Sequence, residues 1–375
     1  MTRVRRILAV TFLSLLLALT ALAVSLSDAH AQSCTWQVIN PPDPAPSQSA
    51  LQGVASLSSN DVWAFGFAAT NPTLQIQHYN GSQWSLVSAP ALPSSAAFES
   101  MSALSSNSIW AAGIQESASI GAVALVAHWD GSQWSPVPTP ADAYNSQLFS
   151  VVALGKNDVW VAGLISTAPF VQQSLTEHYD GKAWKMYFLS YGTSLTSIAG
   201  TSPDGVWAGG IGVNLPGALM FGWQPNNHQW VQYPNKVGNF IQTMSAKSSR
   251  EVWAVGPTGG YPGPVFVEKW NGQGWAQVRY PRKNVNSHVH QVEATAPGNA
   301  VWFAGGTNSS THATAFIDRY DGINFTDMHV SNVGSVATSL SGVSPIPKTP
   351  SVWAVGGYSD YEGTAHNLAE RYTCQ

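Results

Sequence analysis

A short apolar strand pattern recurs along the whole chain. The stretch "NDVWAFGF" at residues 60–67 is apolar at consecutive positions rather than alternating ones, which indicates a strand buried on both faces. It returns as "NSIWAAGI", "NDVWVAGL", "DGVWAGGI", "REVWAVGP", "NAVWFAGG" and "PSVWAVGG". The tryptophans of these copies are separated by 47, 50, 47, 46, 49 and 51 residues: Trp63, Trp110, Trp160, Trp207, Trp253, Trp302 and Trp353. No long segment has helical periodicity, so the pattern predicts an all-β chain.

Each copy contains the signals of four strands. In the first copy they are "LQGVASL", "VWAFGFA", "TLQIQHY" and "QWSLV". Asn80-Gly81 between the last two predicts a two-residue type I′ hairpin, whose two central positions need positive φ. A period near 50 with several short strands is typical of a propeller blade. The seven copies therefore predict one seven-bladed β-propeller over residues 32–375.

All 16 tryptophans fall on repeat positions, and we interpret them as packing residues. Besides the seven above, three precede the hairpin turn: Trp129, Trp223 and Trp270. Six occupy the outer strand: Trp36, Trp84, Trp134, Trp184, Trp230 and Trp275.

The last copy lacks a fourth strand after Tyr372, and the N-terminus contains an unpaired one. "SCTWQVINPP" at residues 33–42 matches the outer-strand pattern "GSQWSPVPTP", with Trp36 in the place of Trp134. We therefore expect the N-terminal strand to complete the last blade. The alignment puts Cys374 and Cys34 at adjacent places of a hairpin turn, which predicts a disulfide between the two chain ends.

Residues 1–31 have the pattern of a secretory signal: basic residues, an apolar run over residues 7–24 and the small-x-small site Ala29-His30-Ala31. Cleavage would leave Gln32 first and no stable membrane insertion. The apolar run is also long enough for an uncleaved anchor. Lipid attachment at Cys34 is disfavoured because "AQSC" lacks a leucine-like residue three positions earlier. The expected protein is secreted and monomeric.

Charge narrows the range of partners. Loss of the signal removes three of the 16 basic and one of the 20 acidic residues, which leaves a net charge of −6. Without a basic stripe, nucleic acid is not an expected partner. Charged residues are only 10% of the chain, a composition that suits a turn-rich secreted β-protein.

The strand endings "VWAVGG" and "VWFAGG", followed by "RYDG" or "ERYT" and a tryptophan about five residues beyond the aromatic, resemble the kelch family. The chain is also similar to secreted bacterial propellers with "DVWAVG" followed by "HWDG..W", which are kelch-like or galactose-oxidase-like. The resemblance implies the propeller fold. A galactose-oxidase copper centre would need a thioether cysteine and a further domain. Since both cysteines are expected to pair, we expect no cofactor.

Two groups of residues are candidates for ligand binding. Aromatic side chains fall in the long loops of the face where second and third strands connect, and aromatics among amides suit a carbohydrate; packing over their own blades is the alternative. They are Tyr144, Phe170, Tyr191, Tyr261, Tyr358 and Tyr361. The second group should ring the channel mouth: Gln52, Glu99, Phe149, Thr196, Gln242, His290 and Ser341. Lining a wet channel is the alternative role for these residues.

Metal binding and catalysis have weaker signals. His288 and His290 are spaced to share one side of a strand and His312 lies in the next loop, but no compact metal motif accompanies them. Paired carboxylates could act as acid and base in a hydrolase or lyase. The candidates are Glu99, Glu116, Asp142, Asp360 and Glu362.

Three functions are consistent with this pattern. The first is a non-enzymatic propeller that binds an extracellular glycan or protein through its loop face. The second is a polysaccharide hydrolase or lyase, and the third is a structural or adhesive surface protein. The absence of a linear catalytic motif favours the first and the third.

Overall fold

The computed structural model describes residues 34–45, 48–68, 73–168, 171–212, 218–234, 240–258, 263–282, 287–308, 312–334 and 336–374, with Asn308 described in its backbone only. The chain divides into two units, Met1–Thr35 with Cys374–Gln375, and Trp36–Thr373. The predicted signal segment at residues 1–31 lies outside the described residues. So do Phe170 and Tyr261.

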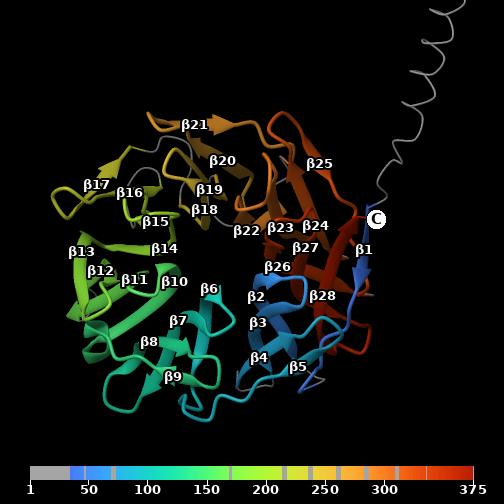
Figure 1. Ribbon diagram of the computed structural model, residues 1–375, viewed down its shortest axis with the longest axis horizontal. Coiled ribbons are helices and arrows are strands. Elements are labelled where there is room, and N and C mark those ends of the chain that lie inside the picture. The colour runs from blue at the N-terminus through green and yellow to red at the C-terminus, as the bar shows by residue number, and fades with distance from the viewer. Residues whose placement is uncertain are drawn as a thin grey trace, which may run out of the picture. The chain divides into compact units, whose positions relative to one another are not determined.

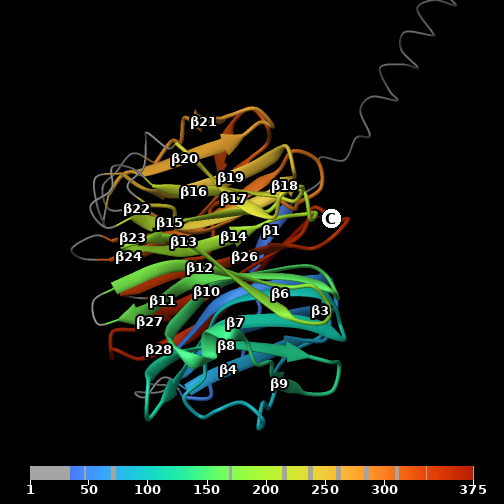
Figure 2. The ribbon, with the colours of Figure 1, turned by 90° about the vertical axis from the view of Figure 1, so that its left-hand side faces the viewer.

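The larger unit is a ring of antiparallel sheets (Figure 1). Five sheets have four strands each: β2 (Ser49–Ser58), β3 (Asp61–Ala68), β4 (Thr73–Tyr79) and β5 (Trp84–Leu86); β6 (Ala97–Ser105), β7 (Ser108–Ser117), β8 (Gly121–Trp129) and β9 (Trp134–Pro136); β10 (Asn145–Gly155), β11 (Asp158–Ala168), β12 (Val171–Tyr179) and β13 (Trp184–Tyr191); β14 (Thr193–Ala199), β15 (Trp207–Gly212), β16 (Leu219–Gln224) and β17 (Gln229–Tyr233); β18 (Thr243–Ser248), β19 (Glu251–Pro257), β20 (Val265–Trp270) and β21 (Trp275–Val278). A 3-10 helix, η1 (Pro140–Ala143), precedes β10. In the edge-on view, β10, β11 and β12 run side by side (Figure 2).

The prediction of seven separate four-stranded blades is wrong. The ring has five such blades, and the last seven strands form one continuous eight-stranded sheet with the first strand: β22 (Ser287–Glu293), β23 (Val301–Asn308), β24 (Ala313–Tyr320), β25 (Phe325–Asp327), β26 (Ala337–Pro345), β27 (Val352–Ser359), β28 (Ala365–Cys374) and β1 (Cys34–Val38). The join is a parallel pairing of Ala313 on β24 with Ala337 on β26. Ala313 N also donates to Val336 O at 3.3 Å. Hydrogen bonding between β24 and β26 therefore joins two repeats, which the sequence pattern predicts as separate blades, into one sheet.

The prediction that the N-terminal strand completes the sheet of the last repeat is confirmed. β1 lies next to β28, and Ile39 N donates to Ala369 O at 2.9 Å. The predicted disulfide joins Cys34 and Cys374. The two chain ends are thus joined covalently across 340 residues of sequence.

The connections between third and fourth strands differ from the predicted two-residue hairpin. Tyr79 pairs with Trp84, so four residues form the turn. Gly81 has a positive φ of 99°, whereas Asn80 is not among the described residues with positive φ. Instead, Asn80 Oδ1 accepts hydrogen bonds from the backbone N–H groups of Ser82 and Gln83. The Asn or Asp is selected because its side chain can cap this turn.

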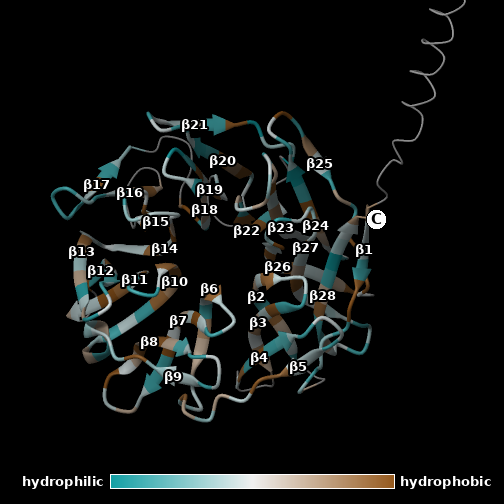
Figure 3. Cartoon of the chain, viewed as in Figure 1, coloured by the Kyte–Doolittle hydropathy of each residue, from teal (hydrophilic) through white to brown (hydrophobic). Residues whose placement is uncertain are grey.

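The tryptophans pack between neighbouring sheets, as predicted. Trp63 on β3 contacts Trp129 and Trp134 of the next sheet, with ring centroids 5.0 and 6.3 Å away. The same kind of contact joins the last repeat to the first: the side-chain centroid of Trp353 lies 4.8 Å from that of Tyr79 and 5.2 Å from that of Trp84. All seven second-strand tryptophans are buried, and outer strands such as β9 and β17 carry hydrophilic residues (Figure 3).

A glycine three residues after each of these tryptophans shapes the inner strands. Gly113 pairs with Phe98 across β6 and β7, and a Cβ on it would overlap the carbonyl oxygen of Ala97. The inner strand approaches so closely that a side chain has no room. The same overlap occurs at every copy: Gly66, Gly113, Gly163, Gly210, Gly256, Gly305 and Gly356. Next to the glycine pair the inner strand contains a β-bulge, for example at Glu99.

Buried polar side chains on several third strands hold the linker that enters the same repeat. Glu177 Oε1 accepts from Ala141 N at 2.9 Å, and Glu370 Oε2 accepts from Ser331 N at 3.3 Å. Both glutamates are fully buried, and burial raises the pKa of each to about 7. Asp318 at the equivalent position is neutralised by Arg282, whose Nε lies 2.7 Å from Oδ2. Glu177 and Glu370 have no such cation in the described ion pairs.

Within the described residues, no helix has the length and apolar character needed to cross a membrane.

Removing the disulfide should lower the free energy of unfolding. In the chain-entropy account a bridge that closes a loop of this length contributes up to about 5 to 6 kcal/mol. We expect C34S/C374S to unfold at a lower urea concentration than the oxidised protein. A reductant should shift the wild-type midpoint and leave that of the variant unchanged. Equal midpoints for oxidised and reduced protein would contradict this role.

Glu177 and Glu370 should make the protein more stable in mild acid. Between about pH 4.5 and 7 the folded state keeps their protons while the unfolded chain releases them, so the free energy of unfolding falls as pH rises across this window. Each group contributes on the order of 2 to 3 kcal/mol. Urea unfolding at pH 5 and pH 8 should show a smaller difference for Glu177→Gln, whereas exposed Glu116→Gln should match wild type. An unchanged difference for Glu177→Gln would argue against a protonated buried carboxyl.

Candidate functional site

A polar cavity of about 400 Å³ lies on the ring axis and is lined by residues of the inner strands. Figure 1 shows these strands, β2, β6, β10, β14, β18, β22 and β26, nearest the centre. The volume is within the range of small-ligand pockets. All residues predicted to ring the channel mouth line it: Gln52, Glu99, Phe149, Thr196, Gln242, His290 and Ser341.

Six of these seven residues are the extra residue of a β-bulge. The register of β2 against β3 skips Gln52, between the pairs Leu51–Gly66 and Gly53–Phe65. Equivalent skips occur at Glu99, Phe149, Thr196, His290 and Ser341. Gln242 directly precedes β18. A bulge redirects a side chain out of the pleat, and here the redirected side chains line the axis.

Hydroxyl groups behind the bulges connect successive inner strands. Ser100 Oγ accepts from Val151 N at 3.2 Å, and Ser197 Oγ accepts from Met244 N at 2.9 Å. Three further side chains accept in the same way from the next inner strand: Ser150 from Ile198 N, Thr243 from Val292 N and Gln291 from Val343 N. These N–H groups lie on the open edge of each inner strand, where no further strand can accept from them. The side-chain bonds therefore satisfy them and hold the cavity wall in place.

Three ionisable groups face this cavity. Burial raises the pKa of Glu99, and burial raises that of Glu293 against hydrogen bonds from Thr295 and Ser245. Burial, assisted by the charge of His288, lowers the pKa of His290 to about 4. His290 is therefore neutral at physiological pH. The sequence patterns did not indicate Glu293, although it lies three residues beyond His290 on the same predicted strand.

The candidate metal ligands do not converge. His288 is buried at 4% exposure, with its ring centroid 6.5 Å from that of His290. His312 is exposed. No group of three histidine, cysteine or acidic residues able to hold a metal occurs in the part of the chain that the structure describes.

Of the predicted loop aromatics, three are exposed on the face where the inner strands begin. Tyr144 is 46% exposed, Tyr191 is 70% exposed and Tyr361 is 81% exposed. Tyr144 directly precedes β10, Tyr191 lies two residues before β14, and Tyr361 lies in the β27–β28 connection. This connection is next to the start of β26, because Ser359 pairs with Ala337.

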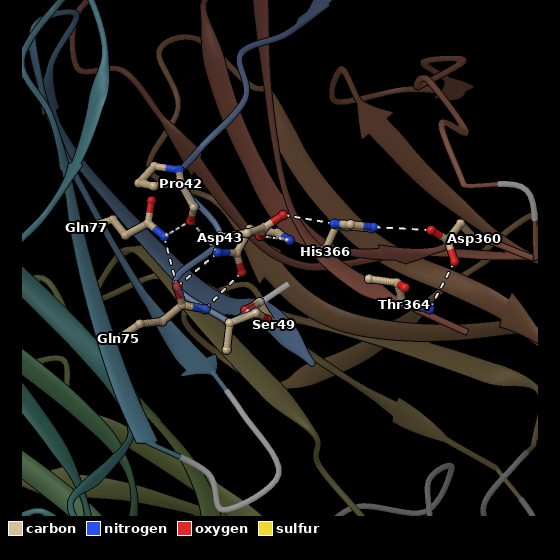
Figure 4. Close-up of polar contacts among 10 residues, drawn as sticks. Pro42, Asp43, Ser49, Gln75, Gln77, Asp360, Thr364 and His366 are labelled. Atoms are coloured by element: carbon tan, nitrogen blue, oxygen red, sulfur yellow. Dashed lines mark hydrogen bonds and ion pairs between the residues drawn. The ribbon is translucent and has the colours of Figure 1, made fainter. Parts of the chain in front are cut away.

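Tyr358 has a different environment. It is half-buried, and its ring stacks on His366 at a centroid distance of 4.8 Å. Figure 4 shows that His366 bridges Asp43, at 2.9 Å from Nδ1, and Asp360, at 3.4 Å from Nε2. The hydrogen bond to Asp43, assisted by Asp360, raises the pKa of His366. Because both ring nitrogens of His366 contact carboxylates, this side chain is better suited to holding Asp43 and Asp360 in place than to transferring a proton.

The same cluster fastens the segment that follows β1. Asp43 Oδ1 accepts from Asn367 N at 2.7 Å, and Pro42 O accepts from Asn367 Nδ2 at 2.8 Å and from Gln77 Nε2 at 2.9 Å. Gln75 and Asn367 exchange two amide hydrogen bonds of 2.9 Å. These contacts join β4, β28 and the N-terminal segment. We call Asp43, Gln75, Gln77, His366 and Asn367 the polar clasp.

The remaining candidate acids lie outside the cavity. Asp142 accepts from Thr139 N at 3.0 Å and caps η1. Glu116 and Glu362 are exposed. Only Glu99 among the predicted acids is brought into the cavity.

The ring of sheets around an axis defines a β-propeller, and solved structures of this class match the chain. "YCF48 bound to D1 peptide" is 16% identical, covers 90% of this chain and 95% of its own, and has a TM-score of 0.56. "Crystal structure of RRP9 WD40 repeats" is 8% identical, with coverage of 91% and 97% and a TM-score of 0.60. "Structure of SapL1 lectin in complex with alpha methyl fucoside" is 16% identical, with coverage of 75% and 96% and a TM-score of 0.50.

No protein-family model and no curated protein sequence matches the chain. The kelch resemblance therefore has no support at the level of a family, and the structural matches show the fold alone.

His366 should stabilise the protein only while it is protonated. Its raised pKa means that the stabilisation is present below pH 6.5 and is lost as pH rises through the higher folded-state value. His366→Gln should lose on the order of 1 kcal/mol at pH 6 and little at pH 9, measured by urea unfolding. His329→Gln, a histidine with a 90% exposed side chain, is the matched control. Equal losses of unfolding free energy at both pH values would contradict a role for protonated His366 in the polar clasp.

Proposed function

We propose that the protein is a secreted, non-enzymatic binding propeller whose ligand is an extracellular glycan. The observation that carries the proposal is the axial cavity with its ring of bulge residues. Amide, hydroxyl and carboxyl groups of this ring can hydrogen-bond sugar hydroxyls, and Phe149 offers an apolar ring face. The fold supplies the rigid wall that such a site needs.

The exposed tyrosines extend the proposed site over the surrounding face. Tyr191 and Tyr361 present rings that are not needed to cover their own sheets, as their exposed fractions of 70% and 81% indicate. Aromatic rings stack on the C–H faces of sugars at small entropic cost. A glycan chain of several sugars could thus contact these rings on the face where the inner strands begin.

Secretion and monomeric state are part of the proposal. The N-terminal pattern at residues 1–31 supports export. The Cys34–Cys374 disulfide supports an oxidising compartment. A protein ligand on the same face is the principal alternative to a glycan.

A second candidate function, polysaccharide hydrolysis or lyase cleavage, has one observation in its favour. Glu99 and Glu293 both line the cavity, and burial raises the pKa of both. A raised pKa favours the protonated carboxyl, which is the form that a general acid needs. Glu99→Gln would abolish product formation under this hypothesis.

A polysaccharide panel tests both functions with one preparation. We expect at least one polysaccharide to raise the melting temperature of the purified protein without release of reducing sugars. Tyr191→Ala and Tyr361→Ala should weaken that binding by about 5- to 10-fold, since each removes one stacking contact. Their melting temperatures should change by less than about 1 °C, because exposed side chains contribute little to folding.

Ile323→Ala is the matched control for the tyrosine variants. Ile323 is 83% exposed in the turn between β24 and β25, at the opposite strand ends. It should leave binding unchanged. Product release would favour the enzyme, and a panel with neither binding nor products would reject the glycan proposal.

A further inference from the structure

The axial cavity contains no fixed positive charge. None of the described residues that line it is a lysine or an arginine. Its ionisable groups are Glu99, Glu293 and His290. A ligand inside the cavity therefore meets carboxyl groups and an imidazole, and no permanent counter-ion for an anion.

The protonation states keep the cavity neutral or negative. His290 has a pKa of about 4, so it does not become cationic above pH 5. Burial raises the pKa values of Glu99 and Glu293, and a carboxyl group is either neutral or negative in any case. At no pH between 5 and 8 does the cavity gain a positive group.

The wall also presents hydrogen-bond donors that carry no charge. Ser100 Oγ and Ser197 Oγ accept a backbone N–H from the next strand, which leaves the hydrogen of each hydroxyl to donate. Gln52 and Gln242 add amide groups, which can both donate and accept. Such donors match hydroxyl and ring oxygens but do not offset the cost of burying an anion.

From this composition we propose that the axial cavity selects an uncharged sugar residue and excludes sugars that carry a carboxylate, sulfate or phosphate. The inference rests on the proposed glycan binding and names the part of a glycan that enters the cavity. Phe149, the only apolar member of the ring, supplies the face on which the sugar stacks. Charged sugars of a longer chain remain on the surrounding face.

Matched pairs of methyl glycosides test the selectivity. The probes are methyl glucoside, galactoside and mannoside with their corresponding uronic acids, titrated calorimetrically into the purified protein at pH 7.5. We expect at least one neutral glycoside to bind and its uronate to bind at least about 30-fold more weakly, because the buried carboxylate of the uronate would lose its hydration, find no cation and face the carboxyl groups of Glu99 and Glu293. Equal or tighter binding of the uronate would overturn the inference.

Variants assign that selectivity to the cavity. Glu99→Gln keeps the shape of the side chain and should reduce the discrimination to below about 10-fold. Phe149→Ala should weaken the neutral glycoside by about 10-fold. Glu116→Gln, an exposed carboxyl outside the cavity, should behave as wild type. Unchanged discrimination in Glu99→Gln would show that the charge selection arises elsewhere and would overturn the proposal.

The two proposals fail in different ways. If polysaccharides bind but no methyl glycoside does, and Glu99→Gln and Phe149→Ala leave polysaccharide binding unchanged, glycan binding stands and the cavity is not its site. If neither polysaccharides nor glycosides bind, both proposals are rejected.

Discussion

The contact on which the ring depends is the packing of each second-strand tryptophan against an aromatic pair in the next repeat. Trp160 meets Trp223 and Trp230 at 4.8 and 5.6 Å. The same contact joins Trp353 to Tyr79 and Trp84, so the last repeat must lie against the first. Large aromatic surfaces provide most of the burial energy at such a junction. With few charges available, the chain uses its tryptophans to determine how the sheets meet.

These aromatic contacts join the sheets away from the axis, and the inner strands add hydrogen bonds nearer to it. The glycines at Gly113 and its equivalents let each inner strand approach its neighbour closely, and the bulge beside the glycine directs one side chain to the axis. Hydroxyls such as Ser100 then bond the next inner strand. A stable wall around a polar space follows, without any requirement on what the bulge residue itself is.

The sequence predicts the features that recur in every repeat, and it predicts little of the contacts that occur only once. Strand order, tryptophan packing and the Cys34–Cys374 bridge follow from register alone, because equivalent positions have equivalent surroundings. The sheet join at Ala313 and Ala337 was missed because one backbone pairing leaves no pattern in the residues. Asp43 and His366 were missed as a pair because 323 positions separate them. Their proximity exists only once the ring has closed.

The same difference explains why the repeats in the sequence predict the fold but not the ligand. The second-strand tryptophan and the glycine three residues after it are the same in every copy, whereas the cavity-lining position carries Gln, Glu, Phe, Thr, Gln, His and Ser in turn. A position that packing constrained would not tolerate a carboxyl, a phenyl ring and a hydroxyl in equivalent places. This variation places an asymmetric set of groups in a nearly symmetric frame. An asymmetric set can orient an asymmetric ligand, which identical copies of a single residue could not do.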